Sequence, residues 1–164
     1  MKKKINQNEK GMTLVEVVVS LLFITLGLVP IFGIFSSSFN LAARIQNNLI
    51  AANLAQEGIE VVRAIRDASW MKDEVFDQNL PNGDYLVSWD SHALIPYNPS
   101  TFLKRNNNSV YSHTAGNDTF FKRRINISRI GTCDCELKII SEVTWLEKRI
   151  NRTIAIESHL FNWR

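Results

Sequence analysis

The sequence is poor in the residues that build several common kinds of functional site. Its 164 residues include only two cysteines, Cys133 and Cys135, too few for the disulfide framework of a small secreted domain. No Ser, Cys or carboxylate accompanies the three histidines, His92, His113 and His159, in a recognisable catalytic order. Neither a Gly-rich phosphate loop nor an H-E-x-x-H motif occurs. We therefore expect a chain that is not an enzyme and that has no catalytic residue, no cofactor and no metal site.

Charge is also missing from one long stretch. No residue from Val17 to Phe35 is charged, and these 19 residues approach the roughly 20 that cross a bilayer as a helix. The formal net charge of +3 comes from residues 1–11, which hold four lysines and one glutamate. The rest of the chain is formally neutral, so the basic pI is no argument for nucleic-acid binding.

Two ordinary interpretations fit this N-terminal region incompletely. A secretory signal peptide has an apolar core of about 7–15 residues and a small-residue cleavage site, whereas this core is longer and is followed by Ser36-Ser37-Ser38-Phe39. A plain membrane anchor would keep the N-terminal lysines in the cytoplasm and the rest of the chain outside. Neither explains a glycine before the apolar run and a carboxylate five residues after that glycine.

The stretch Lys10-Gly11-Met12-Thr13-Leu14-Val15-Glu16 resembles the processing site of type IV prepilins and of type II secretion pseudopilins. The resemblance implies that a membrane-embedded peptidase cuts after Gly11 and that the new terminus, Met12, is N-methylated. It implies that Glu16 pairs with the Met12 ammonium of a neighbouring subunit. Met12 departs from the Phe usual at this position, and Pro30 matches a helix-breaking proline of related proteins. Residues 52–63 and 160–163 further resemble minor subunits, and the C-terminal disulfide loop of major pilins is not matched.

The resemblance also implies an organisation and a location. Residues 1–11 would be a cleaved leader, residues 12–35 a transmembrane and filament-core helix, and residues 36–164 a globular head. The protein would first lie in the cytoplasmic (inner) membrane as a single-pass protein with its head outside, and then in an envelope or cell-surface filament. Its partners would be other pilin subunits, the prepilin peptidase and the assembly machinery, with nucleic acid unlikely. The alternative is a single-pass anchored binding domain, and an extracytoplasmic enzyme comes last.

Apolar residues recur at steps of three and four after Phe35, which is typical of one face of a helix. We expect one helix from about Thr13 to Asp67, whose residues from about 36 to 67 are amphipathic. The expected stripe is Phe39, Ala42, Ile45, Leu49, Ala52, Ala55, Ile59, Val62 and Ile65.

Three later segments alternate between apolar and polar residues with a period of two, which predicts a half-buried antiparallel sheet over about residues 119–161. A short strand is expected from Tyr85 to Trp89, and a long loop over residues 91–118. The sheet needs a cover for its apolar face, and the helical stripe is the available one. The fold class expected is α+β, a pilin-like long N-terminal helix packed on a C-terminal antiparallel sheet.

Two short motifs have less specific interpretations. Cys133-Asp134-Cys135 is half of a zinc site at best, and we expect turn residues that oxidise outside the cell. The run Phe120-Phe121-Lys122-Arg123-Arg124 mixes aromatic and basic residues as a platform for single-stranded DNA does. A strand with a charged outer face explains the same run, and we expect that.

Overall fold

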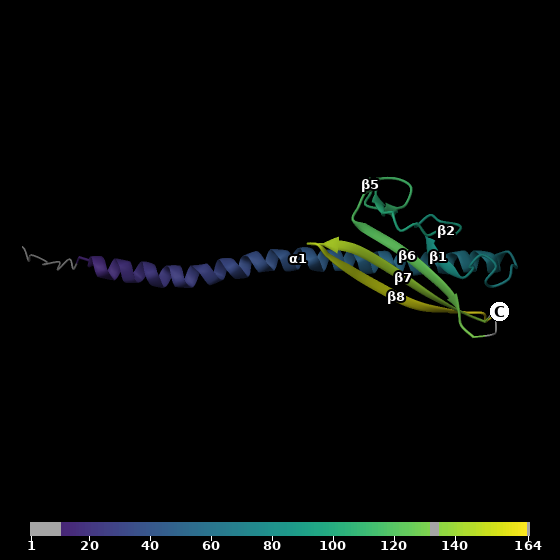
Figure 1. The fold of residues 1–164 in the computed structure, drawn as a ribbon, viewed down its shortest axis with the longest axis horizontal. Coiled ribbons are helices and arrows are strands. Elements are labelled where there is room, and N and C mark those ends of the chain that lie inside the picture. The colour runs from purple at the N-terminus through teal and green to yellow at the C-terminus, as the bar shows by residue number, and fades with distance from the viewer. Residues whose placement is uncertain (1–10, 132–134, 164) are drawn as a thin grey trace, which may run out of the picture. The chain divides into compact units, whose positions relative to one another are not determined.

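A computed structural model of the chain describes residues 11–131 and 135–163. The chain divides into two compact units, Met1–Ile45 and Gln46–Arg164, called here the N-terminal and C-terminal units. The helix α1 (Leu14–Met71) supplies residues to both, and Figure 1 shows it as the longest element. It ends four residues later than expected.

The described part of the N-terminal unit is helical from Leu14 onward, and its side chains are almost all exposed. The helix continues through Pro30. Its most apolar 18 residues have a mean hydropathy of 2.6 and no buried side chain. By length and composition, this helix is able to cross a membrane.

The C-terminal unit is built around a five-stranded antiparallel sheet in the order β2-β1-β6-β7-β8. Three long neighbouring strands form most of it: β6 (Phe121–Arg129), β7 (Glu136–Glu147) and β8 (Ile150–Phe161). These confirm the three alternating runs, and with the helix they confirm an α+β layout. The β7–β8 connection is Lys148-Arg149, whose positive φ values of 47° and 69° fit the twist of a tight hairpin.

The expected strand at residues 85–89 is displaced, because β1 spans Gly83–Leu86 and pairs with β6 and with β2 (Ile95–Pro96). The prediction of a long loop over residues 91–118 was wrong in part. This segment contains β2 and a three-stranded sheet of very short strands in the order β4-β3-β5, formed by β3 (Lys104–Arg105), β4 (Tyr111–Ser112) and β5 (Asn117–Asp118). Two-residue strands are too short to show a period, so the sequence gives no sign of them.

The core lies between the sheet and residues 51–70 of α1. Ala55, Ile59, Val62 and Ile65 of the expected stripe are buried, but Leu49 is 61% exposed. The buried face is rotated so that Ala51, Leu54 and Gly58 lie on it. A Cβ atom on Gly58 would lie 2.6 Å from Ser141 Oγ and 2.7 Å from Ile125 Cδ1, so the backbone of α1 approaches the sheet closely here. Glycine has no apolar side chain, so Gly58 did not count in the sequence pattern. The apolar stripe was therefore predicted at the larger residues beside it.

Candidate functional site

The residues of the expected processing site lie together at the start of α1. Gly11, Met12 and Thr13 precede the helix, and Glu16 is its third residue. The backbone N–H of Glu16 donates to Thr13 Oγ1 at 3.3 Å, and that of Val17 donates to Thr13 O at 3.2 Å. Thr13 is therefore the N-cap of the helix, and the Thr-x-x-Glu spacing is that of a capping box.

This arrangement gives Glu16 a local role beside the one that the resemblance implies. A carboxylate in the first turn of a helix is stabilised by the positive end of the helix dipole, typically by about 0.3–1 kcal/mol. Glu16 is exposed in the described chain, and it is the one acidic residue of the first turn of α1. Its carboxylate is therefore available to a group outside the chain.

Gly11 lies in open surroundings. A Cβ atom built there meets no atom within 4 Å, and Met12 beside it is 67% exposed. A larger residue at position 11 is therefore free of clashes within the described chain. Any effect of such a substitution on cleavage would then report on what recognises the segment, and the substitution itself leaves the fold intact. The remainder of the expected leader, residues 1–10, lies outside the described residues.

Among the described residues of the C-terminal unit, the most buried charged group is Arg123, whose side chain is 0% exposed. Its guanidinium donates to Leu54 O at 2.8 Å, to Glu57 Oε1 at 3.0 Å and to Val87 O at 2.6 Å. Burial lowers the pKa of Arg123, and the Glu57 carboxylate opposes that shift. Arg123 thus joins α1, β6 and the segment after β1, and its role is structural.

The burial of Arg123 changes the interpretation of the aromatic and basic run at residues 120–124. Arg123 points into the core between Lys122 and Arg124, which point outward. Lys122 lies over the Phe102 ring at 4.4 Å, and Arg124 pairs with Glu142 at 3.1 Å. The aromatic member Phe121 is 2% exposed. The run therefore presents two outward cations that already contact other residues, which is a weak platform for nucleic acid.

His113 lies near this buried cation. Its backbone N–H donates to Ser88 Oγ at 3.0 Å, while neither ring nitrogen has a hydrogen-bond partner among the described residues. Burial, and next the charge of Arg123, lower the pKa of His113 from 6.5 to about 4. The imidazole is therefore neutral at physiological pH, and no nucleophile is bonded to it.

The other candidates for chemistry are held in surface contacts. His159 lies between Glu136 Oε1 at 2.6 Å and Glu157 Oε1 at 3.0 Å, and these carboxylates raise its pKa. Cys135 is disulfide-bonded and so offers no thiolate, and Cys133 lies outside the described residues. In residues 11–131 and 135–163, no group of three or more His, Cys, Asp or Glu side chains is arranged to hold a metal ion.

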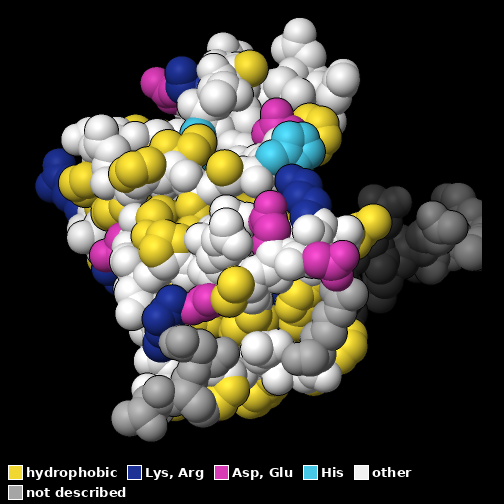
Figure 2. Space-filling view, turned by 90° about the vertical axis from the view of Figure 1, so that its right-hand side faces the viewer, with side chains coloured by type: hydrophobic (Ala, Val, Ile, Leu, Met, Phe, Trp, Pro, Cys, Tyr) yellow, Lys and Arg dark blue, Asp and Glu magenta, His cyan; other side chains and the backbone are white. Residues whose placement is uncertain are grey.

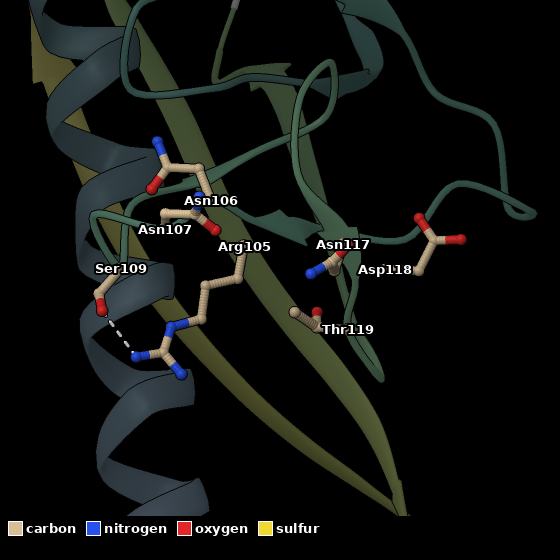
Figure 3. Close-up of a pocket in the computed structure, with 7 residues that line it drawn as sticks. All are labelled: Arg105, Asn106, Asn107, Ser109, Asn117, Asp118 and Thr119. Atoms are coloured by element: carbon tan, nitrogen blue, oxygen red, sulfur yellow. Dashed lines mark hydrogen bonds between the residues drawn. The ribbon is translucent and has the colours of Figure 1, made fainter.

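A polar hollow of about 340 Å³ lies beside the small sheet. In Figure 3, Arg105 extends toward Ser109, to which its guanidinium donates at 2.7 Å, and Asp118 points away from it. Amide side chains of Asn106, Asn107 and Asn117 line the rest.

A second hollow, of about 490 Å³, lies where α1 ends. The indole rings of Trp70 and Trp163 meet edge to face at 4.6 Å, and Arg66 lies over Trp70 at 4.4 Å. Trp163 is 73% exposed and Met71 is 88% exposed. Figure 2 shows exposed hydrophobic side chains scattered among charged ones on this side of the molecule. Trp163 is therefore the exposed ring of the pair, whereas Trp70 is 9% exposed and already contacts both Trp163 and Arg66.

Comparisons of the chain with family models, with curated proteins and with solved structures gave no match. The functional assignment therefore depends on the chain's own residues.

Proposed function

We propose that the chain is a minor pilin or pseudopilin, a structural subunit of a type IV pilus, a type II secretion filament or a DNA-uptake filament. The observation that carries the proposal is the N-terminal arrangement. An unhindered Gly11 precedes a helix capped by Thr13, and Glu16 is the last charge before the uncharged segment that begins at Val17. Prepilin peptidase would cut after Gly11, and Met12 would be N-methylated. Until assembly, the subunit would stay in the cytoplasmic (inner) membrane with its C-terminal unit outside.

The physical reason for an acid at this place is the pairing of charges in a medium of low dielectric constant. The α-amino group of Met12 exists only after cleavage, and a free α-amino group is largely protonated near neutral pH. Leaving either charge unpaired in lipid is costly, so pairing between neighbouring subunits is favoured. The exposed apolar helix supports the same proposal, because in a filament its side chains would pack against those of other subunits.

The test of this proposal is incorporation of Glu16 variants into filaments. We expect Glu16→Gln to insert, to be cut and to keep a folded C-terminal unit, yet to be absent from sheared or co-purified filaments. Glu16→Asp, which keeps the charge, should restore part of the incorporation. Thr13→Ala is the matched control for the cap, because it removes the Thr13 oxygen at a cost of about 1 kcal/mol and keeps the carboxylate. Equal incorporation of Glu16→Gln and the unmodified chain would show that Glu16 is only an interfacial acid and that its charge is not needed for assembly.

A further inference from the structure

Among residues 11–131 and 135–163, no strand pairs with the outer side of β8, which is therefore an open edge of the main sheet. The strand pairs with β7 one residue against one, from Glu136↔Phe161 to Glu147↔Ile150, with no bulge and no proline. Figure 1 draws it as the outermost of the three long strands. The other edge of this sheet, β2, is only two residues long. Natural sheets usually protect a long edge with a bulge, a proline or charged residues. The strand β8 has no bulge, proline or lysine, and its charged residues Arg152 and Glu157 are paired with Glu147 and Lys138.

The register shows which backbone groups face this open edge. The N–H of Asn162 donates to Cys135 O at 2.8 Å, so this pair is a hydrogen-bonded one. Because such pairs alternate along an antiparallel ladder, even-numbered residues of β8 direct their N–H and C=O groups to β7. The odd-numbered residues direct theirs to the open edge, and these are Asn151, Thr153, Ala155, Glu157, His159 and Phe161.

The side chains beside this edge carry little unbalanced charge. On the outer face of the sheet, which carries the odd-numbered side chains of β8, Glu157 forms an ion pair with Lys138 at 2.8 Å and contacts His159, and His159 contacts Glu136. On the inner face, Arg152 lies 3.4 Å from Glu147. An incoming strand would therefore meet neighbouring charges that already have partners.

The inner face of β8 is covered only in part. Ile154 and Ile156 are half-buried, whereas their β7 partners Val143 and Ser141 are 0% exposed. Ile150, on the same face, is 54% exposed. A strand added beside β8 would cover these isoleucines if its own inward residues were apolar.

We infer that β8 is a docking edge for an extended segment of another polypeptide, which adds a strand to the main sheet. The segment that fits alternates apolar residues, placed beside Ile154 and Ile156, with uncharged polar residues on the outer face. Backbone hydrogen bonds would supply affinity, and the alternate side chains would supply selectivity.

A second copy of this chain fits less well. Antiparallel β8–β8 pairing would run residues 46–71 of the two copies in opposite directions, whereas neighbouring subunits of the proposed filament point the same way; this step rests on the proposed function. Parallel pairing about a two-fold axis along the strands would turn the second copy over. Ile154 and Ile156 would then lie beside the polar face of that copy. A different polypeptide meets neither difficulty.

The experiment measures amide hydrogen exchange by NMR on the full chain in detergent micelles. The probe is a nine-residue peptide of alternating valine and threonine with a lysine at each end. We expect the probe to slow exchange at the six odd-numbered amides at least about tenfold and to leave the even-numbered amides unchanged. The same peptide, N-methylated at the residues that would face β8, should have no effect, because it lacks the donors.

Ala155→Pro tests the edge from the protein's side. It removes an N–H that faces the open edge and leaves the ladder with β7 intact. We expect it to abolish the protection, while Ala155→Thr, which keeps the N–H, should retain it. Protection by the N-methylated peptide, or no protection by the unmodified one, would overturn the inference. If the odd-numbered amides were protected without any peptide and the protein had the mass of a dimer, the partner would be a second copy of this chain. That result would also overturn the inference. None of these outcomes depends on cleavage, so they leave the proposed function untouched.

Discussion

The close approach of α1 to the sheet at Gly58 makes a sharp prediction for Gly58→Ala. The new Cβ would lie 2.6 Å from Ser141 Oγ, 2.7 Å from Ile125 Cδ1 and 3.3 Å from Arg123 Cδ. All three side chains are 0% exposed, so they have little room to move away. Overpacking of this kind costs up to about 3 kcal/mol. Alanine recovers about 1 kcal/mol through its higher helix propensity. The expected net loss in the free energy of unfolding is about 2 kcal/mol.

The assay is thermal unfolding of the full chain in detergent micelles, followed by near-ultraviolet circular dichroism. All four tryptophans lie beyond residue 45, so the signal reports on the C-terminal unit. A loss of about 2 kcal/mol lowers Tm by about 8 °C in a domain of this size. Ala64→Gly, at an exposed position of α1, measures the helix-propensity effect without a packing change.

A second variant tests the cause of that loss. Ser141 Oγ is buried without a hydrogen-bond partner among the described residues, so Ser141→Ala alone should be nearly neutral. Combined with Gly58→Ala, it removes the nearest clash, and the two changes should couple by about 1 kcal/mol. A stability of Gly58→Ala equal to or above that of the unmodified chain would refute the close approach.

Three further changes test the core of the C-terminal unit by chemical or thermal unfolding. Ile59→Asp places a charge at a position that is 4% exposed, and we expect it to cost several kcal/mol and unfold the unit, whereas Ala64→Asp on the exposed face should be tolerated. Arg123→Ala leaves two backbone carbonyls and Glu57 without their donor, so it should cost about 3–5 kcal/mol, and a smaller loss than that of Glu57→Gln would contradict the proposed role. The pKa of His113 is lowered from 6.5 to about 4. The folding stability that depends on its neutral imidazole is therefore fully present above pH 6.5 and is lost as the pH falls toward 4. His113→Gln should therefore lose less stability than the unmodified chain between pH 7 and pH 4.5, and equal losses would show that His113 is not the group responsible.

The elements that the sequence predicted are those whose own residues repeat often enough to show a period. The helix and the three long strands were predicted because each has apolar residues at regular steps over nine or more residues. The small sheet was not, because its strands are two residues long and depend on contacts such as Leu103 N–H to Phe121 O at 2.8 Å.

The inward direction of Arg123 was missed for a different reason. A basic residue within a strand ordinarily faces water, and this one is buried because acceptors at Leu54 and Val87, distant in sequence, surround it. One signal was present: Arg123 shares its parity with Phe121 and Ile125, so strict alternation places it on the apolar face. At the N-terminus, the cap at Thr13 was open to prediction from the Thr-x-x-Glu spacing alone. The pairing of Glu16 with a neighbouring subunit involves a second chain and stays a prediction.

The most direct test of the central claim is the mass of the N-terminal peptide of the protein extracted from membranes of its host. If the chain is a pilin or pseudopilin, that peptide begins at Met12 and carries one added methyl group. Gly11→Val should remain uncut, and because a side chain at position 11 meets no atom within 4 Å, misfolding would not explain the result. A peptide that begins at Met1, or unchanged cleavage in Gly11→Val, would contradict the assignment.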